Sequence, residues 1–123
     1  MAADEAERLT ARFAEGAATV AIIGLGYVGL PLVLAMVAAG FPVLGFDTDG
    51  AKIAALRQGR SYIRHIPAAP LAAAAEAGRF QPTAEFARLA EADAILICVP
   101  TPLDRHRDPD LSYVEATVRQ IAR

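Results

Sequence analysis

Residues 19–32 read TVAIIGLGYVGLPL, and this stretch decides the fold. A short run rich in β-branched residues leads into a glycine turn and then into an apolar helix, which is the first half of a βαβ unit. The glycines follow the order G-x-G-x-x-G. Gly24 permits the tight turn out of the strand, Gly26 lets a phosphate group approach the backbone, and Gly29 lets the helix pack closely on the strand. The free N–H groups at the start of the helix would then bind the phosphate without a basic side chain.

A second apolar run, residues 41–46, ends at Asp47, which lies 18 positions after Gly29. In a dinucleotide-binding βαβ unit, an acidic residue at this point binds the adenosine ribose hydroxyls. Its charge also repels a 2′-phosphate, which favours NAD over NADP as the cofactor. A simpler interpretation is that the glycines only pack a helix on a sheet and that Asp47 only ends a strand. The order of strand, turn, helix, strand and acid favours dinucleotide binding.

The uncharged run over residues 16–46 is long enough to suggest a membrane span. Pro31 and Pro42 interrupt it, three glycines gather near its start, and valine and isoleucine give way to leucine and alanine after them. Strands of a parallel sheet are buried on both faces and therefore read as continuous apolar runs. We expect a soluble domain with no membrane partner.

The composition limits the other classes of partner. A formal net charge of −2 over 123 residues gives no basic surface for nucleic acid. A single cysteine, Cys98, excludes an internal disulfide and a site built from several cysteines. His65 and His106 have no cysteine or acid spaced to complete a metal site, so we expect no metal. Residues 1–15 lack the pattern of a secretory signal, and we expect a cytoplasmic location.

The remaining chain is predicted to supply two further strands and several short helices. Ser112 is expected to cap the last helix, with Glu115 completing a capping box. The predicted strands are 19–24, 42–47, 80–83 and 94–99; the helices are 4–14, 27–39, 50–58, 71–77, 84–90 and 111–123; the loops are 59–70 and 104–110. We divide the chain into an N-terminal amphipathic extension, 1–16, and a partial dinucleotide-binding domain, 17–123.

These elements predict an α/β fold of the Rossmann type, a doubly wound parallel sheet. A full domain of this kind has six strands in the order 3-2-1-4-5-6, and four are found here. Strands in the order 3-2-1-4 leave the last strand as an apolar edge, and we infer a fragment of a longer protein. Ligands bind beyond the carboxyl ends of such strands. The glycine turn and residues 99–102 should therefore face the same crevice.

Several motifs occur together along the chain: GLGYVGLPL at 24–32, GFD at 45–47, Asp93, VPTPL at 99–103 and PDLSYV at 109–114. Together they resemble one family, the nucleotide-sugar 6-dehydrogenases of the UDP-glucose/GDP-mannose dehydrogenase family. The resemblance covers nearly the whole chain after Ala17. Within the family, the segment SYIRHI, residues 61–66, is most like the branch that oxidises UDP-N-acetylhexosamines, such as UDP-N-acetylglucosamine 6-dehydrogenase.

The resemblance implies a two-fold oxidation of the sugar C6 alcohol to a carboxylate, with two NAD⁺ and a thioester on a cysteine. It also implies a nucleotide-sugar substrate and a parent enzyme that is a homo-oligomer in the synthesis of polysaccharides. The nucleophilic cysteine, its helper lysine and an asparagine belong to later parts of the family's chains and have no counterpart here. We therefore predict no catalytic residue in this chain, which would not be competent alone.

The same resemblance assigns roles at the cofactor. Val28 would contact NAD through its backbone, Asp47 would hold the adenosine ribose with Lys52 near it, and Thr101 would lie on the nicotinamide side. Lys52 is also explained as an exposed helix residue. The predicted cofactor-binding residues are Gly24, Gly26, Tyr27, Val28, Gly29, Asp47, Lys52, Val99, Pro100 and Thr101.

Three alternative interpretations concern the function. Cys98 could be mistaken for the nucleophile, but it lies in an apolar strand without a basic neighbour and is interpreted as a small core residue. Because these residues include no activated nucleophile, the chain could instead be a non-catalytic module that senses a dinucleotide. The β-hydroxyacid dehydrogenases share the Gly-Leu-Gly turn but do not account for residues 99–103.

Overall fold

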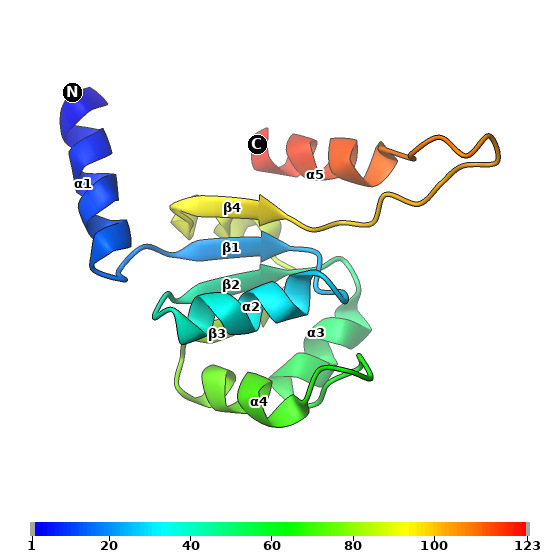
Figure 1. Cartoon of the computed structure of the whole chain (residues 1–123), viewed down its shortest axis with the longest axis horizontal. Helices are drawn as coiled ribbons and strands as arrows, with labels where there is room; N and C mark the ends of the chain where they lie inside the picture. Colours follow the sequence, from blue (N-terminus) through cyan, green and yellow to red (C-terminus); the bar gives the residue numbers. More distant parts are fainter. Residues whose placement is uncertain (1, 123) are drawn as a thin grey trace.

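A parallel four-stranded sheet forms the centre of the molecule in a computed structural model that describes residues 2–122. The strand order β3-β2-β1-β4 confirms the prediction (Figure 1). Val20 of β1 pairs with Val43 of β2 on one side and with Ala94 of β4 on the other. The strands are β1 (Val20–Ile23), β2 (Val43–Phe46), β3 (Phe80–Thr83) and β4 (Ala94–Ile97).

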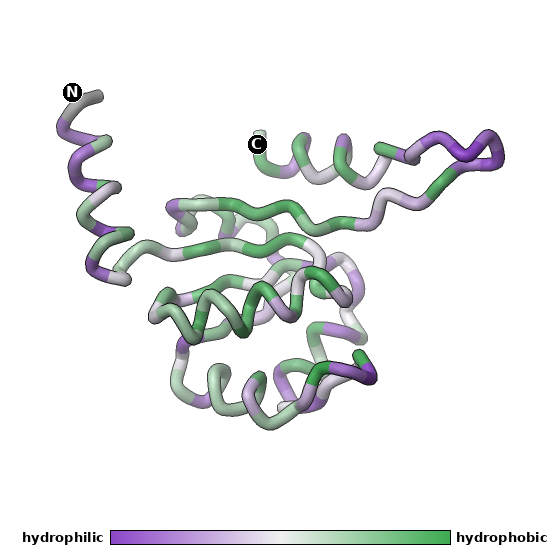
Figure 2. Tube along the Cα trace, in the orientation of Figure 1, coloured by the Kyte–Doolittle hydropathy of each residue, from purple (hydrophilic) through white to green (hydrophobic). Residues whose placement is uncertain are grey.

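The central strands are buried because helices cover both faces of the sheet. Alternate residues of β1 enter two separate cores, as the two-residue period of a strand requires. Val20 and Ile22 pack in one core with side chains from α2, α3 and α4, and Ala21 and Ile23 pack in the other with Leu89. Hydrophobic residues accordingly follow the strands in Figure 2. Strand β4 is an edge of the described sheet, and its residue Ile97 is 40% exposed.

The helices lie close to their predicted positions. Gly40, Gly59 and Gly78 follow three of them with positive φ angles, the conformation that ends a helix most readily at glycine. The elements are α1 (Ala2–Ala14), α2 (Gly29–Ala38), α3 (Gly50–Arg57), α4 (Ala68–Glu76), the 3₁₀ helix η1 (Phe86–Glu91) and α5 (Ser112–Ala122).

Two local predictions were wrong. Helix α4 begins at Ala68, inside the predicted loop, because Pro70 sits in the first turn, where no intrahelical N–H bond is needed. Ser112 does not cap α5; it is the first residue of that helix, and its N–H donates to Asp110 Oδ1 at 2.9 Å. The cap therefore comes from a carboxylate two positions earlier than the start of the predicted capping box.

Helix α1 stands away from the sheet at the N-terminal side of the molecule (Figure 1). At its C-terminal end, the ring of Phe13 meets Phe41 edge-on with centroids 6.0 Å apart. Arg12 forms an ion pair of 2.8 Å with Asp93, just before β4. Within residues 2–122, none of the helices is both long and apolar enough to cross a membrane.

Candidate functional site

A cleft of about 830 Å³ opens at the carboxyl ends of β1, β2 and β4. Sites for small molecules commonly occupy about 300–1,000 Å³ and lie at this edge of α/β sheets. The glycine turn and residues 99–102 both line the cleft, as the strand order predicts. Nine of the ten predicted residues are in its wall: Gly24, Gly26, Tyr27, Val28, Asp47, Lys52, Val99, Pro100 and Thr101.

The three glycines of the turn meet three different surroundings. Gly24 has a φ of +99°, and a Cβ on it would lie 2.5 Å from the carbonyl oxygen of Cys98. A Cβ on Gly29 would lie 1.8 Å from the carbonyl oxygen of Gly24, so this glycine packs α2 on the turn and stays outside the cleft wall. A Cβ on Gly26 would meet nothing within 4 Å.

The open space at Gly26 is what a bound pyrophosphate needs. The N-terminal end of α2 lies beside it, and its N-cap residue, Val28, makes no side-chain capping bond. The first N–H groups of a helix have no partner inside the helix, and the helix dipole favours a negative charge there. The turn therefore fits the diphosphate of a dinucleotide.

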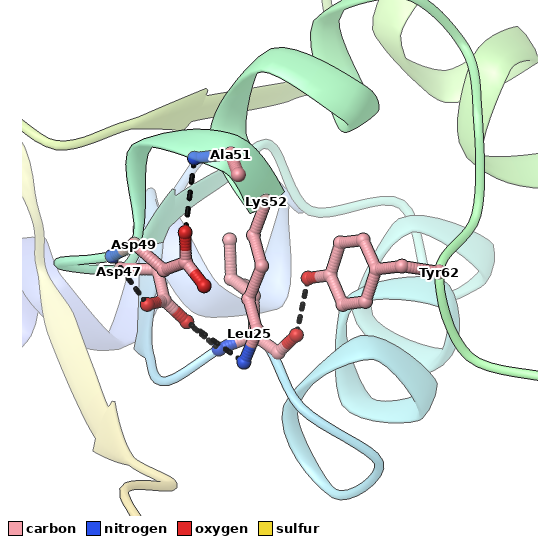
Figure 3. A network of polar contacts seen from close by, with 6 residues as sticks. All are labelled: Leu25, Asp47, Asp49, Ala51, Lys52 and Tyr62. Atoms are coloured by element: carbon pink, nitrogen blue, oxygen red, sulfur yellow. Dashed lines mark hydrogen bonds and ion pairs between the residues drawn. The ribbon is translucent and has the colours of Figure 1, made fainter.

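Asp47 is held from two sides at the end of β2. Its Oδ2 accepts the N–H of Leu25 at 2.9 Å and its Oδ1 accepts the N–H of Asp49 at 2.9 Å (Figure 3). The ammonium group of Lys52 lies 4.0 Å from the same Oδ2. Each carboxylate oxygen has a second lone pair, so Asp47 retains the capacity to accept from ribose hydroxyls. Asp47 therefore both lines the cleft and fixes the glycine turn through its hydrogen bond with the Leu25 N–H.

Tyr62, which was not among the predicted site residues, completes this network. Its hydroxyl donates to the carbonyl oxygen of Leu25, and the Lys52 ammonium lies 5.6 Å from the centre of its ring (Figure 3). Burial raises the pKa of Tyr62 well above its ordinary value, and the charges of Asp47 and Asp49 raise it further. The phenol is therefore protonated and can donate.

Helix α5 supplies a wall of the cleft that sequence reasoning also missed. Tyr113, Thr117 and Gln120 face the cleft, at positions i, i+4 and i+7 of the helix. This spacing places them on one helical face and was the available signal. Ile63 and Phe86 also line the cleft without having been predicted.

Cys98 lies in the cleft wall directly after β4, and its N–H donates to Ile23 at 2.7 Å. Burial raises the pKa of its thiol, whereas an activated nucleophile needs a lowered pKa. This agrees with a structural role. In the part of the chain that the structure describes, no three histidine, cysteine or acidic side chains are grouped to hold a metal ion.

The comparison with known protein families identifies the family of the chain. The family model described as "UDP-glucose/GDP-mannose dehydrogenase family, NAD binding domain" matches residues 18–123. The chain belongs to this family. The cofactor expected from the glycine turn and Asp47, NAD, is the one for which the family's domain is named.

Relatives of the UDP-glucose/GDP-mannose dehydrogenase family match most of the chain. The NDP-N-acetyl-D-galactosaminuronic acid dehydrogenase of Ralstonia nicotianae is 38% identical over 85% of this chain and 24% of its own length. The UDP-N-acetyl-D-glucosamine 6-dehydrogenase of Pseudomonas aeruginosa is 40% identical over 76% of this chain and 21% of its own. The chain spans about a quarter of the length of the curated relatives it matches.

Solved structures of the family share the fold. GDP-mannose dehydrogenase from Pseudomonas aeruginosa, crystallised as a ternary complex, has a TM-score of 0.79 and 36% identity over 83% of this chain and 24% of that one. UDP-glucose dehydrogenase from Pyrobaculum islandicum has a TM-score of 0.80 and 33% identity over 86% of this chain and 25% of that one.

Proposed function

We propose that this chain is the NAD-binding part of a dehydrogenase that oxidises the C6 alcohol of a nucleotide sugar to a carboxylate with two NAD⁺. The observation that carries the proposal is the cleft in which the glycine turn, Asp47 and residues 99–102 meet. The cleft brings together the open backbone at Gly26, the Asp47 carboxylate and a third wall after β4. Taken across the sheet from β2 through β1 to β4, these parts follow the order of adenosine ribose, pyrophosphate and nicotinamide along a dinucleotide.

Each part of the cleft receives a role in this proposal. The backbone of Gly24–Gly29, including Tyr27 and Val28, holds the pyrophosphate at the N-terminus of α2. Asp47 accepts from the adenosine ribose, and Lys52, whose ammonium lies 4.0 Å from the carboxylate, helps to orient it. Val99, Pro100 and Thr101 lie on the nicotinamide side. NAD⁺, when bound, supplies the hydride acceptor, and these residues bind and orient it.

The proposed substrate is a UDP-N-acetylhexosamine. Two observations support it: the segment SYIRHI at residues 61–66, and relatives whose names specify UDP-N-acetyl-D-glucosamine or UDP-N-acetyl-D-mannosamine. We assign no catalytic residue to this chain, and the protonated Cys98 thiol is not the nucleophile of the proposed thioester. We further propose a cytoplasmic homo-oligomer as the parent enzyme and a domain boundary at Ala17.

The deciding measurement is calorimetric titration of NAD⁺ and NADP⁺ into the chain and into Asp47→Ala. We expect NAD⁺ to bind more tightly than NADP⁺, because the Asp47 charge repels a 2′-phosphate. Loss of a hydrogen bond to a charged group costs about 1.5–3 kcal/mol, so Asp47→Ala should weaken NAD⁺ binding by at least about tenfold. Equal affinity for both cofactors, or an unchanged affinity in Asp47→Ala, would contradict the proposed site.

A control separates the effect of the Asp47 carboxylate from that of the negative charge and helix cap beside it. Asp49→Ala removes the neighbouring carboxylate, which caps α3 through Ala51 at 2.9 Å, and retains Asp47. Its affinity for NAD⁺ should stay within about twofold of that of the unsubstituted chain. The alternative of a non-catalytic sensing module is tested in the full-length protein, where turnover of a UDP-N-acetylhexosamine with NAD⁺ would exclude it.

A further inference from the structure

We propose that Tyr62 is a positioning residue for the cofactor, because its hydroxyl fixes the peptide between Leu25 and Gly26 in the orientation that the pyrophosphate-binding turn requires. Tyr62 itself is not part of the cleft wall, so it acts through the turn rather than by touching the ligand. The inference rests on the dinucleotide site of the proposed function and adds a residue to it.

Leu25 is held at three points. Its N–H donates to Asp47 at 2.9 Å, its carbonyl oxygen accepts from the Tyr62 hydroxyl, and its side chain is fully buried. Figure 3 shows the two polar contacts on opposite sides of the residue. The two partners come from different places in the chain, Tyr62 lying 37 positions after Leu25. The residue between the first two glycines is therefore fixed by tertiary contacts.

The hydroxyl bond matters because the following residue is glycine. A Leu-Gly peptide can rotate easily, since Gly26 tolerates backbone angles that other residues avoid. In a trans peptide the carbonyl of Leu25 and the N–H of Gly26 point in opposite directions. While Tyr62 holds the carbonyl, the N–H points away from Tyr62. A rotated peptide would turn a carbonyl oxygen, which repels an anion, toward the side that the N–H now faces.

The loop that carries Tyr62 is itself anchored. Ile66 is buried in the core, and Tyr62 and Ile63 pack against the same core. The hydroxyl of Ser61 donates to the Ile63 carbonyl and accepts the Ile63 N–H, so its bonds stay within the loop. The Lys52 ammonium over the Tyr62 ring adds a contact of the cation–π type. Tyr62 thus reaches the turn from a fixed base.

The test is Tyr62→Phe, which removes the hydroxyl and retains the ring that packs on the core. Ser61→Ala is the matched control, because it removes a hydroxyl from the same loop without touching the turn. Binding of NAD⁺, ADP and adenosine is measured by calorimetry or by NMR titration. Loss of one neutral hydrogen bond corresponds to roughly three- to tenfold in affinity. We expect that loss for NAD⁺ and ADP in Tyr62→Phe, no loss for adenosine, and no change in Ser61→Ala.

A second readout does not depend on a ligand. In ¹⁵N-resolved spectra of the unliganded chain, Tyr62→Phe should shift or broaden the Gly26 amide signal, and Ser61→Ala should leave it in place. Equal affinities of Tyr62→Phe and the unsubstituted chain for NAD⁺, or an equal loss for adenosine and NAD⁺, would overturn the positioning role. Failure of the unsubstituted chain to bind NAD⁺ would instead refute the proposed function, and this inference with it.

Discussion

Replacement of Gly29 by alanine tests how the glycine turn is built. The added Cβ would lie 1.8 Å from the carbonyl oxygen of Gly24 and 2.9 Å from its carbonyl carbon. Both distances are shorter than 3.0 Å, a separation below which Cβ atoms are essentially never found. Both neighbours are backbone atoms. Gly24 cannot move aside, since its N–H donates to Phe46 at 2.8 Å and its own Cβ position is closed by Cys98. Helix α2 must therefore move away from the sheet.

That movement costs free energy in two ways. Overpacking against a close-packed core costs about 1–3 kcal/mol. Leu30 and Val33 of α2 are fully buried. Burial of a whole side chain of this kind contributes about 1.5–3 kcal/mol, and part of that is lost when the side chain is partly withdrawn from the core. We expect Gly29→Ala to lower the free energy of unfolding by about 2–5 kcal/mol. Domains of this size have about 5–15 kcal/mol in total, so the variant would be near its limit of stability.

Gly26→Ala is the matched control, since it makes the same chemical change three positions earlier. Its φ is not positive, and the added Cβ meets nothing within 4 Å. Stability should therefore be unchanged or rise by up to about 1 kcal/mol through the less flexible unfolded chain. NAD⁺ binding should weaken, because the methyl group occupies the space that the pyrophosphate needs.

Urea denaturation followed by circular dichroism measures both free energies of unfolding, and calorimetric titration measures the affinity of Gly26→Ala for NAD⁺. A Gly29→Ala chain within about 1 kcal/mol of the unsubstituted chain would refute the packing argument. A Gly26→Ala chain that binds NAD⁺ with unchanged affinity would refute the assignment of the phosphate to this turn.

Two further predictions concern titratable groups. The Thr19 N–H and the Arg12 guanidinium hold the pKa of Asp93 below its ordinary value. The ionised Asp93 therefore stabilises the fold above about pH 4, and this stabilisation is lost as the pH falls through the lowered pKa. In urea titrations from pH 7 to pH 3, Asp93→Asn should lose less stability than the unsubstituted chain, and an identical loss would contradict the role of Asp93. Burial raises the pKa of the Cys98 thiol, so less thiolate is present at pH 8 in the folded chain. Alkylation of Cys98 by iodoacetamide should therefore be several-fold slower in the folded chain than in urea. Equal rates would contradict this prediction and show that the thiol is accessible.

The sequence by itself determined the sheet and the edge at which the cleft opens. Buried parallel strands read as apolar runs, and the glycine spacing places the turn between the first strand and its helix, so the order 3-2-1-4 follows from local patterns and general rules of connection. Asp47 and residues 99–102 could be placed at the cleft for the same reason: each directly follows a strand whose neighbours were known. Strand β3 was also predicted, although it contains Pro82. In the structure β3 is the edge strand opposite β4, where the missing N–H donor of a proline is tolerated.

Only the tertiary structure decided what surrounds those residues. Tyr62 meets Leu25 because the loop before α4 folds back over the turn, and no period in the sequence encodes a contact made across a loop. The face of α5 that lines the cleft and the carboxylate that caps it likewise depend on how residues 98–111 place that helix. Strands and turns depend on residues that are neighbours along the chain. The walls of the site depend on packing between segments that are distant in sequence, and this packing becomes fixed only when the cores on both faces of the sheet form.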